Sequence, residues 1–458
     1  MLTTPENASL DKASFKKLSP PPFNKTIQAS QAVIWHDGYV YLGAARGPIR
    51  GRGGRAGGHD LGAEIARYDP KSQTWQQVYK TPQESDGNAR DRSIHAFVVQ
   101  NDAAGKPVLY AAASGLRGQV TLLRFDDAAD HFVDCGLPGL GQGGADIAGL
   151  CNICAHEGQV FTSPLGLNKG NGWADDSEAA IAAVLATTDP AGDSWDIISA
   201  PNFDDADNLS ISALCVLNGK LYAATLNRKS GFQLWRSDAL PAQGKTKWTK
   251  LLDRGGFRGP ASPFVASMAV FDGALYVGTG ARPQPKDPFG PHAAELIRVN
   301  ADDSWDLIAG ENRLTPDGLK RPLSGQGPGF DDPFVQAFWR MAVHEGKLYV
   351  GGRDWRAAPT YLPRNGRSEL SPITTEWLQL ETEGWSGDFG LWGGDGKASW
   401  RCITATGLGD NPKQFGIGGM VSTPHGLFVV PTASGAEAGV EVWQAATTKP
   451  PMPRRPDL

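Results

Sequence analysis

One pattern recurs along the chain and constrains its fold more than any other feature. An apolar segment is followed by a short turn that contains glycine, and then by a second apolar segment rich in Tyr, Val and Gly. Asp or Asn next to Gly supplies the positive φ angles that a tight hairpin needs. Each copy therefore predicts two antiparallel strands. The copies lie at 32–44, 95–113, 153–163, 213–225, 267–279, 340–352 and 420–432.

A second pair of strands is predicted after most copies, at 64–78, 121–135, 183–198, 232–252 and 295–309. In each pair an apolar strand ends in a polar turn and returns through Trp or Phe. The turn glycines run from Gly38 to Gly426 at a spacing of about 65 residues, so the chain holds about seven such units. We therefore predict an all-β fold, a single seven-bladed β-propeller of four-stranded antiparallel blades.

The predicted propeller spans residues 1–446, and a Pro-rich tail follows at 447–458. The seventh hairpin is followed by only one further apolar strand, at 440–445. We expect an N-terminal strand near 13–19 to supply the missing outer strand and close the ring. The predicted blades lie near 32–80, 93–136, 148–199, 210–253, 264–310, 336–405 and 416–446.

Composition narrows the range of partners and compartments. The chain has 44 Lys and Arg against 49 Asp and Glu, a net charge of −5, which makes a nucleic-acid partner unlikely. The longest apolar run, 179–186, is too short to span a membrane, and the start lacks the apolar segment of a secretory signal. Five cysteines are an odd number and do not suggest a disulfide framework. We expect a cytoplasmic protein.

Four short segments resemble the repeats of known propeller families. YDPKSQTW at 68–75 and LYVGG at 348–352 resemble kelch repeats, and the segments at 187–195 and 237–248 resemble relaxed Asp-boxes of sialidase-like propellers. The resemblance implies the propeller fold, and it implies that these residues brace the blade turns. It does not extend to activity, because neither the copper ligands of galactose-oxidase-like enzymes nor the Arg triad of sialidases can be placed in this sequence.

The loops of the predicted blades are uneven, which suggests that one face carries the function. The turns inside the repeated hairpins are minimal, whereas the connections that leave from the opposite face are long. Rigid scaffolds commonly place their functional residues on such loops. The long connections carry many arginines with interleaved aspartates. Two interpretations stay open, an anion pocket built on guanidinium groups and a rim of mutually paired charges.

Two residues break the pattern of small side chains on the innermost strands, where they would line the tunnel. They are His95 and Arg340, and a charge at such a position needs a ligand or an ion-pair partner in a neighbouring blade. Acid/base chemistry and anion binding need His, Asp, Tyr and Arg, and Trp can stack on a flat ligand. The predicted catalytic residues are His95, Asp354 and Tyr361. The predicted substrate-binding residues are Arg340, Arg353, Arg92, Trp339, Trp355 and His59.

No metal or cofactor is predicted. Cys151 and Cys154 are three apart in a strand, so their side chains point to opposite faces and, without a bulge, cannot hold one ion together. The acidic segment 204–208 does not follow the spacing of an EF-hand loop, which leaves Ca²⁺ as a weak candidate. We expect an enzyme that acts on an anionic or aromatic small molecule by acid/base chemistry. The alternative is a non-catalytic binding module or scaffold for carbohydrate or a protein partner.

Overall fold

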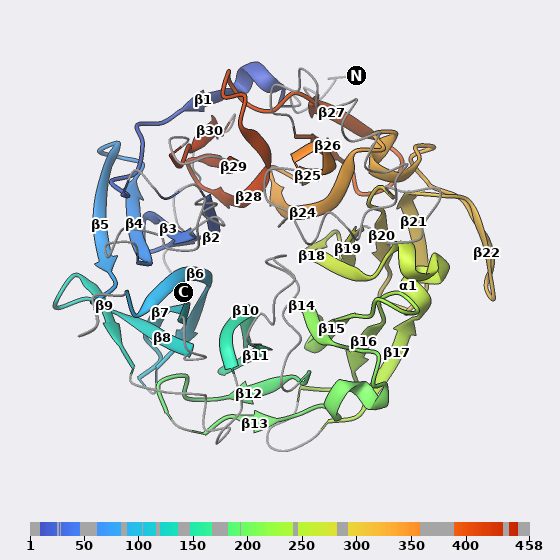
Figure 1. Cartoon of the computed structure of the whole chain (residues 1–458), viewed down its shortest axis with the longest axis horizontal. Coiled ribbons are helices and arrows are strands. Elements are labelled where there is room, and N and C mark those ends of the chain that lie inside the picture. Colours follow the sequence, from blue (N-terminus) through green and yellow to red (C-terminus); the bar gives the residue numbers. More distant parts are fainter. Residues whose placement is uncertain are drawn as a thin grey trace, which may run out of the picture.

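Short antiparallel strands dominate the computed structural model of the chain. The structure describes residues 10–24, 27, 29–45, 62–83, 89–102, 104–115, 120–135, 147–166, 182–192, 194–240, 246–281, 292–357, 389–433 and 439–447. Figure 1 shows the strands arranged in a ring of small sheets, with each sheet running outward from the centre. The chain has the β-propeller fold that the sequence predicts, built from four-stranded antiparallel sheets.

The strands fall into sets of four that are consecutive along the chain, except where the two ends of the chain meet. The first three sets are β2 (Ala29–His36), β3 (Tyr39–Ala45), β4 (Glu64–Asp69) and β5 (Thr74–Lys80); β6 (Asp91–Asn101), β7 (Pro107–Gly115), β8 (Val120–Asp126) and β9 (His131–Asp134); and β10 (Ile147–His156), β11 (Gln159–Gly166), β12 (Leu185–Thr187) and β13 (Asp196–Ile197).

The next two sets are β14 (Ser210–Leu217), β15 (Lys220–Leu226), β16 (Leu234–Ser237) and β17 (Trp248–Leu252); and β18 (Phe264–Phe271), β19 (Ala274–Gly280), β20 (Leu296–Val299) and β21 (Trp305–Ala309). The last two are β24 (Val335–His344), β25 (Lys347–Asp354), β26 (Leu391–Gly394) and β27 (Trp400–Thr404); and β28 (Gln414–Thr423), β29 (Gly426–Ala433), β30 (Trp443–Ala446) and β1 (Phe15–Lys17). Single pairs of β3 with β6, β19 with β24 and β25 with β28 join some neighbouring sets into larger sheets.

A few elements lie outside the four-stranded sets. The hairpin of β22 (Arg313–Thr315) and β23 (Gly318–Lys320) projects beyond the ring between β21 and β24 (Figure 1). The described helical turns are short: η1 (Lys12–Ser14), η3 (Pro201–Asp204), α1 (Arg254–Phe257), η4 (Gly259–Ala261), η5 (Pro328–Phe330) and η6 (Trp355–Ala357). Because these turns are short, the strands form the framework of any site.

The repeated turns form hairpins for the reason read from the sequence. In the first hairpin Asp37 and Gly38 have φ angles of 43° and 87°, and the other acidic or Asn residue–Gly pairs also have two positive φ values. That backbone twists in the same sense as the flanking strands, which lets two residues reverse the chain. The equivalent pairs are 157–158, 218–219, 272–273 and 345–346.

The apolar core is divided into clusters that lie between neighbouring sheets. Tyr41 of β3, for example, packs against Phe97, Phe125 and Phe132 of the second set. A single sheet of this kind cannot bury both its faces, so its stability depends on its neighbours. Another cluster joins the first and last sets, with Val40 and Leu42 in the same cluster as Phe428 and Val430 of β29.

The innermost strands contact one another in sequence around the ring, and β28 contacts β2. On the outside, β1 pairs with β30, where Phe15 lies opposite Ala445. We propose that the seven sets are the seven blades of a ring that this pairing closes, with the blade limits given above.

The segments that resemble kelch repeats and Asp-boxes contain contacts that hold turns in place. The Asp69 carboxylate accepts hydrogen bonds from the Lys71 amide at 2.8 Å and from the Ser72 hydroxyl at 2.9 Å. Trp195 is buried, and the Thr187 hydroxyl donates to the Ser194 carbonyl at 2.8 Å. These contacts stabilise the turns, and the candidate site lies in the inner part of the ring.

Candidate functional site

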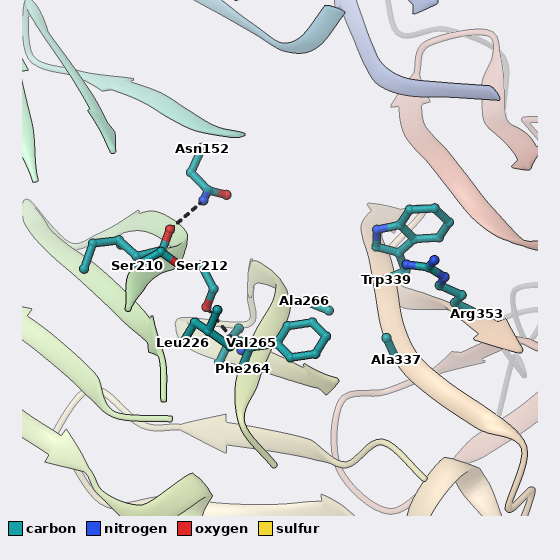
Figure 2. A pocket seen from close by; sticks show the side chains of 11 residues that line it. Asn152, Ser210, Ser212, Leu226, Phe264, Val265, Ala266, Ala337, Trp339 and Arg353 are labelled. Atoms are coloured by element: carbon teal, nitrogen blue, oxygen red, sulfur yellow. Dashed lines mark hydrogen bonds between the residues drawn. The ribbon is translucent and has the colours of Figure 1, made fainter. Parts of the chain in front are cut away.

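A pocket lies at the end of the ring where the innermost strands begin and the second strands end. Its described lining comes from six strands: β10, β14, β15, β18, β24 and β25. It contains about 520 Å³ of empty space, part of which is open solvent. In Figure 2, Ser212 and Phe264 stand on one side of this space, and Trp339 and Arg353 stand on the other. The long connections between strands leave from the same end of the sheets.

The innermost strands share an irregularity in their pairing, and this irregularity shapes the pocket. In each of them the pairing with the second strand skips at least one residue, in the manner of a β-bulge. Strands β6, β10, β24 and β28 skip two residues, and we call the one farther along the strand the skipped residue. The skipped residues are Gln31, His95, Cys151, Ser212, Ala266, Trp339 and Gly418. Two adjacent ones, Ser212 and Ala266, are small, whereas the next is the large Trp339. The pocket lies in the part of the ring where this change in size occurs.

Trp339 and Arg353 form one wall of the pocket. The Arg353 guanidinium carbon lies 4.7 Å from the centroid of the Trp339 ring and 5.8 Å from that of Phe415. Only 7% of Arg353 is exposed, so these ring faces replace water around a cation that would otherwise be costly to bury. A Cβ atom on Gly416 would lie 3.1 Å from the Arg353 Cα, so glycine lets strands β25 and β28 approach closely here.

Short polar side chains form the opposite wall. The Asn152 amide donates to the Ile211 carbonyl at 3.2 Å, and the Ser212 hydroxyl accepts from the Val265 amide at 3.3 Å. Ser210 and Phe264 complete this side. The pocket therefore combines apolar surface, hydroxyl and amide groups and one guanidinium, which is the composition of sites for small organic molecules.

Arg340 follows Trp339 in β24 but has a different role. Its Nε donates to the Gly418 carbonyl at 2.8 Å, its Nη1 to the Trp339 carbonyl at 2.7 Å and its Nη2 to the Gln31 carbonyl at 3.1 Å. All three carbonyls belong to skipped residues. The Arg340 guanidinium also lies 5.3 Å from the centroid of the Trp339 ring. It thus holds backbone of three inner strands next to the pocket.

His95 lies on β6 in a cluster with two serines. Its Nε2 lies 2.9 Å from the Ser93 hydroxyl and 2.8 Å from the Ser114 hydroxyl, and the two hydroxyl oxygens are 2.8 Å apart. Ser93 and Ser114 are also opposite each other in the β6–β7 pairing. No described lining residue of the pocket comes from these two strands.

Asp354 points away from the pocket wall. It follows Arg353 in β25, so its side chain leaves the opposite face of the sheet, where it accepts from Arg356 Nε at 3.0 Å. Burial raises the pKa of Asp354 to about 6, although the Arg356 hydrogen bonds and charge oppose this rise. The neighbouring Trp355 is fully buried and donates from Nε1 to the His292 carbonyl at 2.9 Å.

The structure thus brings three of the predicted residues together, Trp339, Arg340 and Arg353. His95 instead contacts Ser93 and Ser114, and Asp354 contacts Arg356. His59, Tyr361 and the Arg92 side chain lie outside the described residues. Sequence reasoning missed Asn152, Ser210, Ser212 and Phe264, because hydroxyl, amide and phenyl groups at the start of a strand have no distinctive pattern. The one available signal was the small residue at 212 and at 266 where the equivalent position in β24 has Trp.

The described residues contain no group of His, Cys, Asp or Glu side chains that could hold a metal ion. In the acidic segment 204–208, Asp205 accepts from Gln233 Nε2 at 2.7 Å, and Asp207 pairs with Lys229 at 2.8 Å. Among the helices that the structure describes, none has the length and apolar character needed to cross a membrane.

Comparisons with known proteins add little about function. No protein-family model and no curated protein matches the chain. Among solved structures, that of U3-55K has a TM-score of 0.47 at 12% identity, covering 95% of this chain and 99% of the other. The WD40 repeats of RRP9 have a TM-score of 0.48 at 12% identity, covering 96% and 98%.

Puromycin hydrolase is similar to this chain at a TM-score of 0.47 and 14% identity, over 93% of this chain and 54% of that enzyme. Likenesses at this level support no conclusion about activity or partners. The function must be argued from the pocket itself.

Proposed function

We propose that the protein binds a small molecule with an anionic group and a flat apolar part in the pocket between β14, β18 and β24. The observation that carries this proposal is the stacking of the Arg353 guanidinium on the Trp339 ring in the pocket wall. The contact with the Trp339 ring holds the guanidinium in the pocket wall. Its planar fork suits a carboxylate or a phosphate better than the ammonium of Lys does.

The remaining lining residues suit the flat apolar part of the proposed ligand. Phe264, Leu226 and Ala266 supply apolar surface, and Ser210, Ser212 and Asn152 supply groups that accept or donate hydrogen bonds. Sites for small organic ligands typically combine mostly apolar walls with a few polar groups. An aromatic carboxylic acid is the simplest class that satisfies both walls.

The proposal is tested with a panel of aromatic acids, aliphatic acids, organic phosphates and the neutral amides of the same acids. We expect an aromatic acid to raise the melting temperature of the wild type, because a ligand at about 100 times its Kd adds about 2.7 kcal/mol of stability. Arg353→Met should lose the response to the acid and keep the weak response to its amide.

Arg236→Met is the matched control, because Arg236 pairs with Asp303 away from the pocket. It should respond to the ligand as the wild type does. A panel without any ligand for the wild type would contradict the proposed function and leave the scaffold alternative.

A second function, catalysis, is favoured by the Ser93–His95–Ser114 cluster. An imidazole within hydrogen-bond reach of a hydroxyl can act as a general base toward it, and an activated serine is the usual nucleophile of acyl transfer. A fluorophosphonate reagent should then label Ser114, which is the less buried of the two serines. Labelling should be lost in Ser114→Ala and in His95→Gln. Equal labelling of the wild type and Ser114→Ala would rule this function out.

We also propose that the protein is located in a reducing compartment such as the cytoplasm. Its support is that Cys135, Cys154, Cys215 and Cys402, the cysteines whose side chains the structure describes, are free thiols. Mass spectrometry of the protein isolated with its thiols blocked would test it.

A further inference from the structure

The Arg340 side chain joins three inner strands that are far apart in the sequence. Its three guanidinium nitrogens donate to carbonyls on β24, β28 and β2, at residues Trp339, Gly418 and Gln31. Strands β28 and β2 belong to the last and first of the four-stranded sets. Arg340 therefore connects, on the inside of the ring, the first set with the last set, whose outermost strand is the N-terminal strand β1.

The skipped residues explain why the carbonyls need such a partner. A skipped residue has no opposite partner in the second strand, and a buried carbonyl without a donor is costly. Elsewhere in the ring, the carbonyl just before a skipped residue accepts from a shorter side chain of one neighbouring strand. The Ser267 hydroxyl donates to the Phe338 carbonyl at 2.5 Å, and Asn152 donates to the Ile211 carbonyl. Only arginine has a fork of donors that can reach two further strands at once.

The same guanidinium also fixes a wall of the pocket. Arg340 donates to the Trp339 carbonyl and lies 5.3 Å from the centre of the Trp339 ring, while Arg353 lies 4.7 Å from it. Trp339 is therefore in contact with two cations, one that lines the pocket and one that holds β28 and β2. A shift of either inner strand would move Arg340 and, with it, the backbone and ring of Trp339.

We propose that Arg340 is a positioning residue, which couples closure of the ring between its first and last sheets to the shape of the pocket through Trp339. This inference rests on the proposed function in that it gives the bound ligand a way to act on the ring. Coupling between two parts of a protein is reciprocal. A ligand held against Trp339 stabilises the contact between β28 and β2, and loosening that contact weakens the ligand.

The test compares Arg340→Lys and Arg340→Met with the wild type. Lysine keeps the charge, but the three donors of its ammonium share one nitrogen, which cannot replace three guanidinium nitrogens that each reach a different strand. Ligand affinity is measured by calorimetry with the tightest aromatic acid of the panel. Amide hydrogen exchange is measured in β2 and β28. We expect affinity to fall at least tenfold in both variants, and exchange in β2 and β28 to become at least tenfold faster.

Arg236→Lys and Arg236→Met are the matched controls, because they remove a charged contact between two neighbouring sheets without touching Trp339. They should lower the melting temperature and change the ligand affinity less than twofold. A purely structural role of Arg340 would instead make the two pairs of variants alike. Should Arg340→Met not fold, Arg340→Lys alone decides the comparison.

Two results separate this inference from the proposed function. Unchanged ligand affinity in the Arg340 variants, with a wild type that binds the ligand, overturns the coupling and leaves the pocket function intact. If no aromatic acid binds the wild type, the proposed function and the coupling to a ligand both fail, whereas the exchange measurement still decides whether Arg340 closes the ring. Wild-type exchange rates of β2 and β28 in Arg340→Met would overturn that closing role.

Discussion

The Arg353 guanidinium lies 4.7 Å from the ring centroid of Trp339, and the two side chains form one wall of the pocket. Because Arg353 is almost fully buried, this contact should contribute measurably to stability, about 1 to 2 kcal/mol. Urea unfolding of Trp339→Leu, Arg353→Met and the double variant should give a coupling energy of that size. The same cycle with Tyr68→Leu, on a different strand, should be additive to within about 0.5 kcal/mol.

Strand β1 should be essential to the stability of the ring. Phe15 is 6% exposed and packs in the cluster with Leu427 and Ala445, whereas its neighbour Lys16 is exposed. Phe15→Ala should lower the free energy of unfolding by about 3 to 5 kcal/mol, and Lys16→Ala by less than about 0.5 kcal/mol. Thermal unfolding of the two variants side by side measures this. Equal stabilities would mean that β1 does not hold the last sheet.

Asp354 should make stability depend on pH in the direction opposite to an ordinary aspartate. Its pKa is raised from 3.8 to about 6 in the folded protein, so between these values the folded state binds more protons than the unfolded state. Its contribution to stability is therefore present below about pH 4 and is lost as the pH rises through 6. The loss amounts to about 3 kcal/mol, from a shift of roughly two pKa units.

Urea unfolding of the wild type and Asp354→Asn between pH 4 and 8 isolates this contribution. The stability of the wild type relative to the variant should fall by that amount across the range. His344 has the opposite effect, because burial lowers its pKa and its contribution is lost as the pH falls below 6.5. Since both proteins contain His344, it cancels in the difference. A difference that does not change with pH would contradict the raised pKa.

Gly280 should be intolerant of a side chain because of Phe264. A Cβ atom at Gly280 would lie 2.2 Å from the tip of the Phe264 ring, which lines the pocket. Gly280→Ala should destabilise the protein by about 1 to 3 kcal/mol, as overpacking commonly does. Phe264→Leu should restore most of the stability of Gly280→Ala, which differential scanning calorimetry would show. An additive double variant would place the cost elsewhere.

The sequence predicted the strands well because the signals were local. Two adjacent residues, such as Asp272 and Gly273, were enough to identify a hairpin, and their positive φ angles confirm the reason. Repetition then excluded other all-β arrangements, since a unit of four strands that recurs needs neighbours on both sides. Phe15 was found only indirectly, from the absence of an outer strand in the last unit.

The site was harder to predict because it depends on contacts between strands. Trp339 and Arg340 are adjacent, yet one lines the pocket and the other holds three carbonyls, as the skipped position determines. That position is a property of the pairing with β25 and cannot be read from β24 alone. Arg353 and Asp354 diverge for the same kind of reason, because neighbouring residues of a strand leave opposite faces.

The skipped residues have a consequence for how such a chain can change. Each is excluded from the pairing of its own sheet, so a substitution there alters the lining of the ring without disturbing the ladder that defines the blade. Ser212 and Ala266 are therefore exchangeable, whereas Gly418 is not, because a Cβ atom there would lie 2.5 Å from the Ser30 carbonyl oxygen. New specificity could then arise from a substitution at Ser212 or Ala266 alone. A small combinatorial library at these two positions would be a direct route to new ligands.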